Sequence, residues 1–287
     1  MAAPENLNPA LSLFLRHHET LTGLPENTTR IVQMSGDRDC NIFQLLKLIS
    51  HDAGLVGRII QAVNSAYYSL PNKITQLDRA VAYLGLRTIK ELSLAVSIAS
   101  MFKGVALGRY QARDLWDHSM AVALLSRDIA KRSGAADPEE AFLAGMLHDI
   151  GLLFMVQSEP LQAQKLFAAV ESGASSFADA EQSVFGFGHA EAGAAMADQW
   201  KFPPSIREAI RWHHDPEHAE GNSQQMCALI AIADQFCCRS KVGYPLTCAA
   251  VPTSEAIFQL ARVSVQIAES SEAELPKLLQ NAAPMAA

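Results

Sequence analysis

The sequence has few cysteines, and no two of them have the C-x-x-C spacing of redox or zinc motifs. The five are Cys40, Cys227, Cys237, Cys238 and Cys248. The first residues, MAAPENLNPA, lack the basic and then apolar pattern of a secretion signal. We also expect no apolar run approaching the roughly 18 residues that cross a bilayer. These absences predict a reduced, cytoplasmic protein that has no membrane segment.

Basic residues are also scarce. The chain has 23 Lys and Arg against 30 Asp and Glu, a formal net charge of -7. A protein that follows nucleic-acid phosphates presents a basic face, so nucleic acid is not expected as a partner. Because 49% of the 287 residues are hydrophobic, the chain can bury a substantial core in one large or two smaller domains.

The alternation typical of β-strands is not found, and the apolar spacing is helical nearly throughout. Ile42, Leu45, Leu46 and Ile49 fall at i, i+3, i+4 and i+7, and residues 56–63 repeat the pattern. Further helices are predicted over about 75–84, 86–102, 111–132, 138–149, 205–214 and 224–240, with one or two more after residue 252. The glycine-containing basic stretch 103–109 is the expected joint. We predict an all-α fold of two lobes, residues 1–105 and 106–287.

His148 and Asp149 stand side by side inside the apolar run LAGMLHDIGLLF. A buried ionisable pair costs several kcal/mol or more unless it is neutralised, hydrogen-bonded or bound to a cation, so this pair needs partners. Helical spacing supplies candidates, most of them at helix ends or on apolar stripes. With the pair itself the set is Asp114, His118, His148, Asp149, His189, His213, His214 and Asp234. Imidazole and carboxylate together favour Fe, Mn, Zn or Ni.

Single residues of this set have simpler explanations. A lone histidine on an apolar face is more often a hydrogen-bonded core residue than a ligand. Asp114 would favour the helix dipole merely by lying in a first helical turn. Arg207 and Arg211 share a face near the paired histidines, where they form either a phosphate-binding site or a solvated surface. The metal hypothesis therefore depends on the whole set.

The order His118, then His148-Asp149, then the distant Asp234 resembles the HD superfamily. The segments "LPENTTRIVQM", "AVNSAYY", "AVAYLG" and "GMLHDIG" resemble the HDOD domain, the HD-related output domain of bacterial signalling proteins, over about residues 24–240. His189 and the pair His213-His214 resemble the fuller ligand set of the HD-GYP phosphodiesterases, which bind two or three metals. The resemblance thus implies a transition-metal site that is dinuclear in its fuller form.

Two departures from the HD-GYP enzymes stand out. Leu152 occupies the position of a lysine that assists phosphodiester cleavage in that family, and the Gly-Tyr-Pro motif that should follow the paired histidines is missing. A "GYP" at residues 243–245 comes too late and is interpreted as coincidence. The resemblance therefore implies a signalling output protein without catalysis that retains the metal site. The alternatives are a metal-dependent phosphohydrolase acting on a nucleotide or cyclic dinucleotide, and a di-iron oxygenase.

A protein that acts without chemistry needs a partner. We expect a signalling protein to dock on the first lobe, between about Leu24 and Phe102, and a nucleotide or phosphate to be a candidate ligand of the second. Phe14, Tyr67 and Tyr68 are the expected exposed aromatics. The competing interpretation is that the two tyrosines only pack this lobe against its neighbour.

Overall fold

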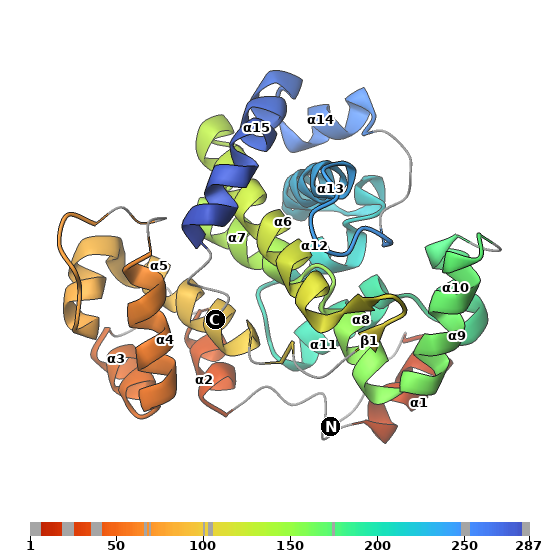
Figure 1. The fold of residues 1–287 in the computed structure, drawn as a ribbon, viewed down its shortest axis with the longest axis horizontal. Helices are drawn as coiled ribbons and strands as arrows, with labels where there is room; N and C mark the ends of the chain where they lie inside the picture. Colours follow the sequence, from red (N-terminus) through yellow and green to blue (C-terminus); the bar gives the residue numbers. More distant parts are fainter. Residues whose placement is uncertain are drawn as a thin grey trace.

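The computed structural model describes residues 7–18, 26–35, 42–65, 68, 70–99, 101–102, 106–173, 176–247 and 253–282. Four helices form the first lobe, and Figure 1 shows them together at one end of the molecule. They are α2 (Glu26–Ser35), α3 (Ile42–Ser50), α4 (Ala53–Val63) and α5 (Leu77–Ala99). Their buried faces carry the apolar residues of the predicted stripes, such as Leu45, Ile49 and Ile59.

The second lobe begins with a short hairpin, β1 (Ala106–Leu107) and β2 (Tyr110–Gln111), at the predicted joint. Its central pair is α6 (Ala112–Ser133) and α7 (Pro138–Leu147), and α8 (Ile150–Ser158) continues from α7. Around them lie α9 (Pro160–Glu171), α10 (Phe177–Val184), α11 (His189–Gln199), α12 (Pro204–Trp212), η1 (Pro216–His218), η2 (Gly221–Ser223), α13 (Gln224–Arg239), α14 (Glu255–Ala261) and α15 (Val265–Ala282). The hairpin is the sole sheet in the described residues, and the all-α prediction is confirmed.

Local signals set several of these boundaries. Asp137 caps α7 by accepting the backbone N–H groups of Glu139 and Glu140. Gly134 ends α6 in the left-handed conformation, and Gly85 interrupts α5 with a φ of 82°, as its predicted helix stop requires. Asn64 ends α4, and its side chain exchanges two hydrogen bonds of 2.7 Å with the backbone of Ile74. Asn64 thereby fixes the connection from α4 to α5.

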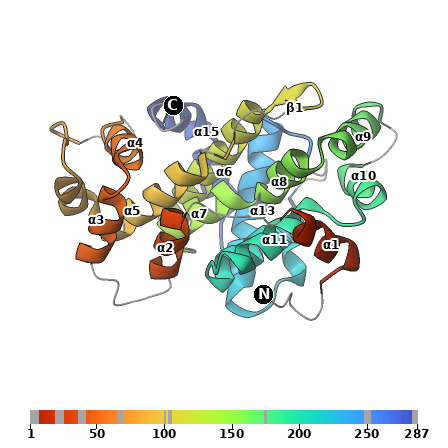
Figure 2. The same cartoon turned by 90° about the horizontal axis from the view of Figure 1, so that it is seen from below.

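Helix α1 (Pro9–His17) packs on the second lobe although it comes first in the chain. Phe14 is 8% exposed and contacts Phe154 and Phe187, and His18 Nε2 lies 3.0 Å from Glu159 Oε1. Figure 2 shows α1 beside α9 and α11, away from α2–α5. The expectation that Phe14 is an exposed docking aromatic is therefore wrong, because the buried Phe14 ring packs α1 against the second lobe. Tyr67 lies outside the described residues.

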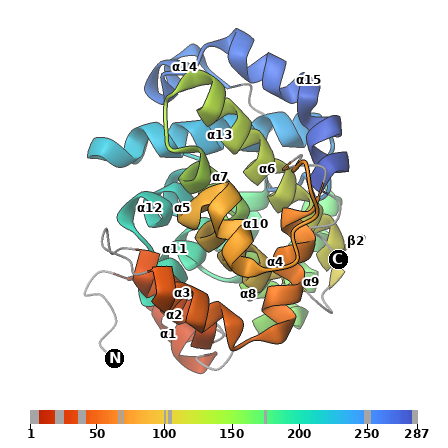
Figure 3. The ribbon, with the colours of Figure 1, turned by 90° about the vertical axis from the view of Figure 1, so that its left-hand side faces the viewer.

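The two lobes meet where α5 crosses α7. In Figure 3 the first lobe lies in front of α6 and α7. Arg87 on α5 pairs with the cap residue Asp137 at 2.9 Å. Glu91, one turn further along α5, is 6% exposed, and its burial, which outweighs nearby Lys90, raises its pKa to about 7. The interface therefore contains a titratable carboxyl group.

One described stretch, Pro138–Ser158, is long and apolar enough to span a membrane by length and composition. The expectation that no run approaches this length is wrong, because α7 and α8 form one apolar stretch in which Asp149 is the single acidic residue after Glu140 and no Lys or Arg occurs. In the structure 89% of the apolar window is buried within the protein. The stretch is the core of the second lobe.

Candidate metal centre

His148 and Asp149 lie at the break between α7 and α8, in the middle of the second lobe. His148 ends α7, and Asp149 occupies the N-cap position of α8 without capping it through its side chain. Both are buried, at 0% and 1% exposure. The break turns the Asp149 carboxylate away from the helix axis, so that its two oxygens face different sets of histidines.

The first set gathers around Asp149 Oδ2. His148 Nε2 lies 3.4 Å and His118 Nε2 3.9 Å from this oxygen. Asp234 on α13 closes the set, because its Oδ1 lies 3.0 Å from His118 Nε2 and 3.7 Å from His148 Nε2. The four residues that the HD resemblance implied as ligands therefore converge from α6, the α7–α8 break and α13.

The second set gathers around Asp149 Oδ1. His189 Nε2 lies 3.1 Å and His213 Nε2 3.6 Å from this oxygen. His214 also belongs to this set, because its Nε2 lies 3.0 Å from His189 Nε2, although the residue as a whole is exposed. The ligand atoms of these four residues lie within 4.8 Å of one another. Asp149 is thus shared by two groups of donors.

Hydrogen bonds on the outer sides of the rings orient these histidines. His148 Nδ1 lies 2.7 Å from the carbonyl of Gly145, and His213 Nδ1 lies 2.8 Å from that of Ile210. Glu181 Oε1 accepts from both Nδ1 (2.8 Å) and the backbone N–H (3.0 Å) of His189. Each acceptor favours the tautomer with the proton on Nδ1, which leaves Nε2 as a lone pair aimed inward. Ligands of metal ions are held in this way.

The electrostatics of the cluster are those of an ion site. Burial by itself lowers the pKa of His148, but the carboxylates of Asp149 and Asp234 outweigh burial and raise it to about 9. Burial likewise raises the pKa of Asp149, but the surrounding histidines, His148 first, hold it well below its usual value. Burial keeps the pKa of His213 low. A proton on His148 therefore occupies the place that a cation would take.

Two residues that hold the cluster were missed from the sequence. Glu181 is 2% exposed and belongs to the apolar stripe of Phe177 and Ala180 on α10, a signal that could have revealed it. Thr247 Oγ1 donates to Asp149 Oδ2 at 3.1 Å, from a loop whose path the sequence pattern does not define. Both bind side chains of the shared centre, one at His189 and one at Asp149.

The segment "GYPLT" after α13 folds back onto this centre. Tyr244 is fully buried, and its backbone N–H donates to the carbonyl of Asp114 at 3.0 Å. Gly243 has a φ of 68°, and a Cβ there would meet the same carbonyl at 2.3 Å. The segment thus has a structural role in bringing Thr247 to Asp149, and the interpretation of its match to the Gly-Tyr-Pro motif as coincidence stays a prediction.

Gly151 and Gly193 allow α8 and α11 to touch at backbone distance. A Cβ on Gly151 would lie 2.0 Å from the carbonyl oxygen of His189 and 2.5 Å from the backbone nitrogen of Gly193. A side chain at either position would push α11 away from Asp149. The glycine that follows His148 and Asp149 so closely is therefore part of how His189 reaches the centre.

Three predicted residues lie elsewhere. Asp114 is not in either group: its Oδ2 accepts the N–H of Gln111 at 2.7 Å, so the carboxylate caps α6, as an acid in a first turn readily does. Arg207 pairs with Asp198 at 2.6 Å and with Glu208 at 3.3 Å. Burial raises the pKa of Glu191, and the positive charge of nearby Arg211 partly offsets this rise. A phosphate-binding role for the two arginines stays a prediction.

The cluster fits a transition-metal ion. His148 Nε2 and Asp149 Oδ1 are buried without a hydrogen bond of acceptable geometry, which a protein interior tolerates rarely and which an ion would satisfy. Imidazole nitrogen and carboxylate oxygen are borderline donors, suited to Fe, Mn, Zn or Ni rather than to Ca. The two groups of donors would hold one ion or two.

An all-α bundle with His, His-Asp and Asp gathered in this order is a protein of the HD type. A family model described as the HDOD domain matches residues 21–216, more than half of the chain. The chain belongs to the HDOD domain family.

Similar proteins agree with this assignment. A solved HDOD domain protein of unknown function from Geobacter sulfurreducens is 26% identical, covers 96% of this chain and 97% of its own, and superposes with a TM-score of 0.79. A Shewanella amazonensis protein, provisionally described as a phosphohydrolase, is 27% identical with 97% of each chain covered and a TM-score of 0.77.

Curated relatives are longer. An uncharacterized protein of Treponema pallidum is 27% identical over 74% of this chain and 41% of its own length, and ribonuclease Y of Mycoplasma mycoides is 26% identical over 58% and 34%. The chain thus spans less than half the length of these relatives.

Proposed function

We propose that this chain is a regulatory output protein of bacterial signalling, acting in the cytoplasm through a protein partner and not through catalysis. In this proposal the second lobe holds one or two transition-metal ions that fix its helices, and the first lobe docks on the partner. The observation that carries the proposal is the closure of the ligand cluster.

The candidate ligands are almost completely buried. His118, His148, Asp149, His189, His213 and Asp234 are each at most 2% exposed, and His214 alone among the candidates is exposed. A hydrolase must bring a phosphodiester and a water molecule to the metal. Thr247 already bonds Asp149, and Leu152, where the HD-GYP resemblance places a catalytic lysine, is 0% exposed. This arrangement favours a structural or sensing ion over a catalytic one.

The proposed docking surface lies on the first lobe. Among the described residues of this lobe, the exposed large apolar side chains are Phe43 on α3 (78%) and Tyr83 on α5 (55%). Exposed aromatics of this kind supply much of the binding energy at protein interfaces. A pull-down with the unaltered chain and with the Tyr83→Ser variant tests this step. Retention of every captured partner by the variant would contradict a contact at α5.

The alternative function is metal-dependent phosphoester hydrolysis. The donor set for two ions is complete, and ribonuclease Y, a similar protein, has a name that denotes RNA cleavage. In such an enzyme His118, His148, Asp149 and Asp234 would hold the ion, which would supply the Lewis acidity that phosphoester hydrolysis needs. The lack of net positive charge weakens the case for an extended RNA substrate.

One experiment separates the two functions. Protein purified without chelator is analysed for metals and assayed with cyclic di-GMP and with a short RNA. The proposal expects about one to two ions per chain and no metal-dependent turnover. Turnover that disappears in Asp149→Ala would establish the enzyme instead. His148→Ala should lose metal, whereas His218→Ala, a 67% exposed surface histidine, should keep it.

A further inference from the structure

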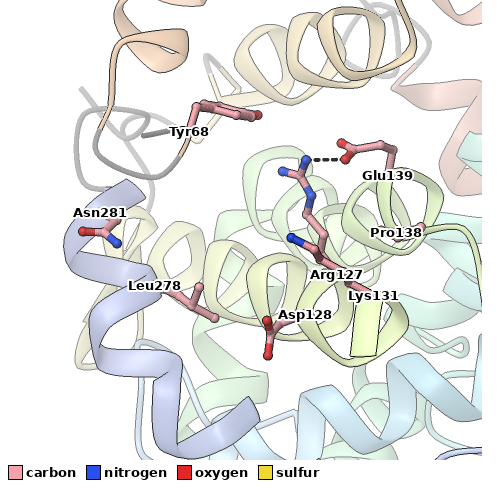
Figure 4. Close-up of a pocket in the computed structure, with 8 residues that line it drawn as sticks. All are labelled: Tyr68, Arg127, Asp128, Lys131, Pro138, Glu139, Leu278 and Asn281. Atoms are coloured by element: carbon pink, nitrogen blue, oxygen red, sulfur yellow. Dashed lines mark hydrogen bonds and ion pairs between the residues drawn. The ribbon is translucent and has the colours of Figure 1, made fainter. Parts of the chain in front are cut away.

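A cavity of about 460 Å³ lies away from the metal centre, where the two lobes meet α15. Its walls come from Tyr68 of the first lobe, from α6 and the start of α7, and from Leu278 and Asn281 on α15. Figure 4 shows these side chains around one space, with Arg127 reaching from α6 toward Tyr68. Cavities that hold small organic ligands have volumes of about 300 to 1,000 Å³. The space is thus of the size of a ligand site.

The wall beside Tyr68 is aromatic and is held by contacts of Arg127. The guanidinium carbon of Arg127 lies 5.6 Å from the centre of the Tyr68 ring and 5.7 Å from that of Phe142, and Arg127 also pairs with Glu139. The side chains of Arg127 and Glu139 are only 13% and 15% exposed. A pre-ordered ring of this kind offers a planar ligand a surface at little cost in conformational entropy.

Of the charged side chains that line the cavity, Lys131 is the cation without an ion pair in the described residues. Glu139 is matched by Arg127, and Asp128 Oδ2 accepts from Arg132 Nε at 2.6 Å. Lys131, one turn from Arg127 on α6, is exposed, and no ion pair of Lys131 occurs within the described part of the chain. The four charged side chains of the lining sum to zero, but Lys131 is the cation among them that an anion can meet without breaking an ion pair of the described residues.

We propose that this cavity binds a small organic anion, namely a planar ring bearing a phosphate or carboxylate. The ring packs between Tyr68 and Leu278, the anionic group meets Lys131, and the amide of Asn281 supplies a hydrogen bond. Because Tyr68 belongs to the first lobe and Lys131 to the second, the occupant contacts both lobes. The affinity of the ligand then depends on the relative position of the two lobes. A ligand that binds one arrangement of the lobes more tightly shifts the protein toward that arrangement.

Calorimetric titration of the full chain with guanosine monophosphate, salicylate and inorganic phosphate tests the proposal. At least one ring-bearing anion should bind with a Kd below about 1 mM, and inorganic phosphate should bind at least about tenfold more weakly. Lys131→Glu should weaken ring-bearing anions by about tenfold or more. Lys165→Glu, the same charge change on the exposed face of α9, should leave them unchanged.

Urea unfolding of both variants confirms that they are folded before titration. Absence of binding by both ring-bearing anions overturns the proposal, as does affinity that Lys131→Glu leaves intact. Equal affinity for inorganic phosphate overturns the role given to Tyr68. Because Lys131 is no part of the metal cluster, these outcomes are independent of whether the chain holds metal or hydrolyses a phosphodiester.

Discussion

Replacing Gly151 by alanine should separate two helices that the metal centre requires in contact. The new methyl group would lie 2.0 Å from the carbonyl oxygen of His189, whereas ordinary contacts of a Cβ begin at 3.4 Å. The three nearest atoms, His189 O and the N and Cα of Gly193, are all backbone, so no side chain can rotate away, and α11 must move by more than an ångström. His189 Nε2 would then leave Asp149 Oδ1, from which it now lies 3.1 Å.

The cost of this change can be bounded. Overpacking a core by one methyl group costs about 1 to 3 kcal/mol, and a clash with rigid backbone belongs at the upper end, so we expect about 3 kcal/mol. Urea unfolding monitored by circular dichroism gives the free energy, and metal analysis gives the occupancy, which should fall. Gly57→Ala is the control, because no atom lies within 4 Å of a Cβ there and the helix gains up to about 1 kcal/mol.

The reasoning fails if Gly151→Ala unfolds within about 0.5 kcal/mol of the parent protein and keeps its full metal content. A stable variant with lost metal would instead show that α11 moves without unfolding the lobe. Either measured loss supports the role of the glycine contact.

Three further predictions concern side chains. Glu91→Gln should stabilise the protein relative to the parent by up to about 3 kcal/mol at about pH 8 and by little at about pH 5. The reason is that the fold favours the neutral carboxyl group of Glu91, whose pKa rises from 4.5 to about 7. Equal gains in urea unfolding at both pH values would refute this. Glu181→Gln should weaken metal binding by about 10- to 100-fold in competition with a chelator while the protein stays folded, and unchanged affinity would contradict the role of Glu181. Thr247→Val should cost about 1.5 to 3 kcal/mol in metal-depleted protein, because Asp149 loses a buried donor; a cost near zero would contradict it.

The sequence revealed the centre where polar residues interrupt helical stripes. His118, His148, Asp149 and Asp234 each lie where periodicity demands an apolar side chain, so the pattern alone could locate them. Asp114 failed this test because an acid in a first helical turn is equally suited to capping. Thr247 could not be found, since its place depends on how a loop folds back. The position of α1 could not be predicted from the sequence either, because the apolar face of a helix does not specify which neighbouring element packs against it.

The stretch Pro138–Ser158 combines two properties that conflict during synthesis. Its length and hydropathy suit a bilayer, and His148 stands at its midpoint with Asp149 beside it. An aspartate at the centre of an inserting helix opposes insertion by about 3 kcal/mol. The ionisable pair therefore biases the nascent segment toward water before His189, His213 and His214 have been made. In the folded protein the same two residues form the centre on which both groups of donors converge.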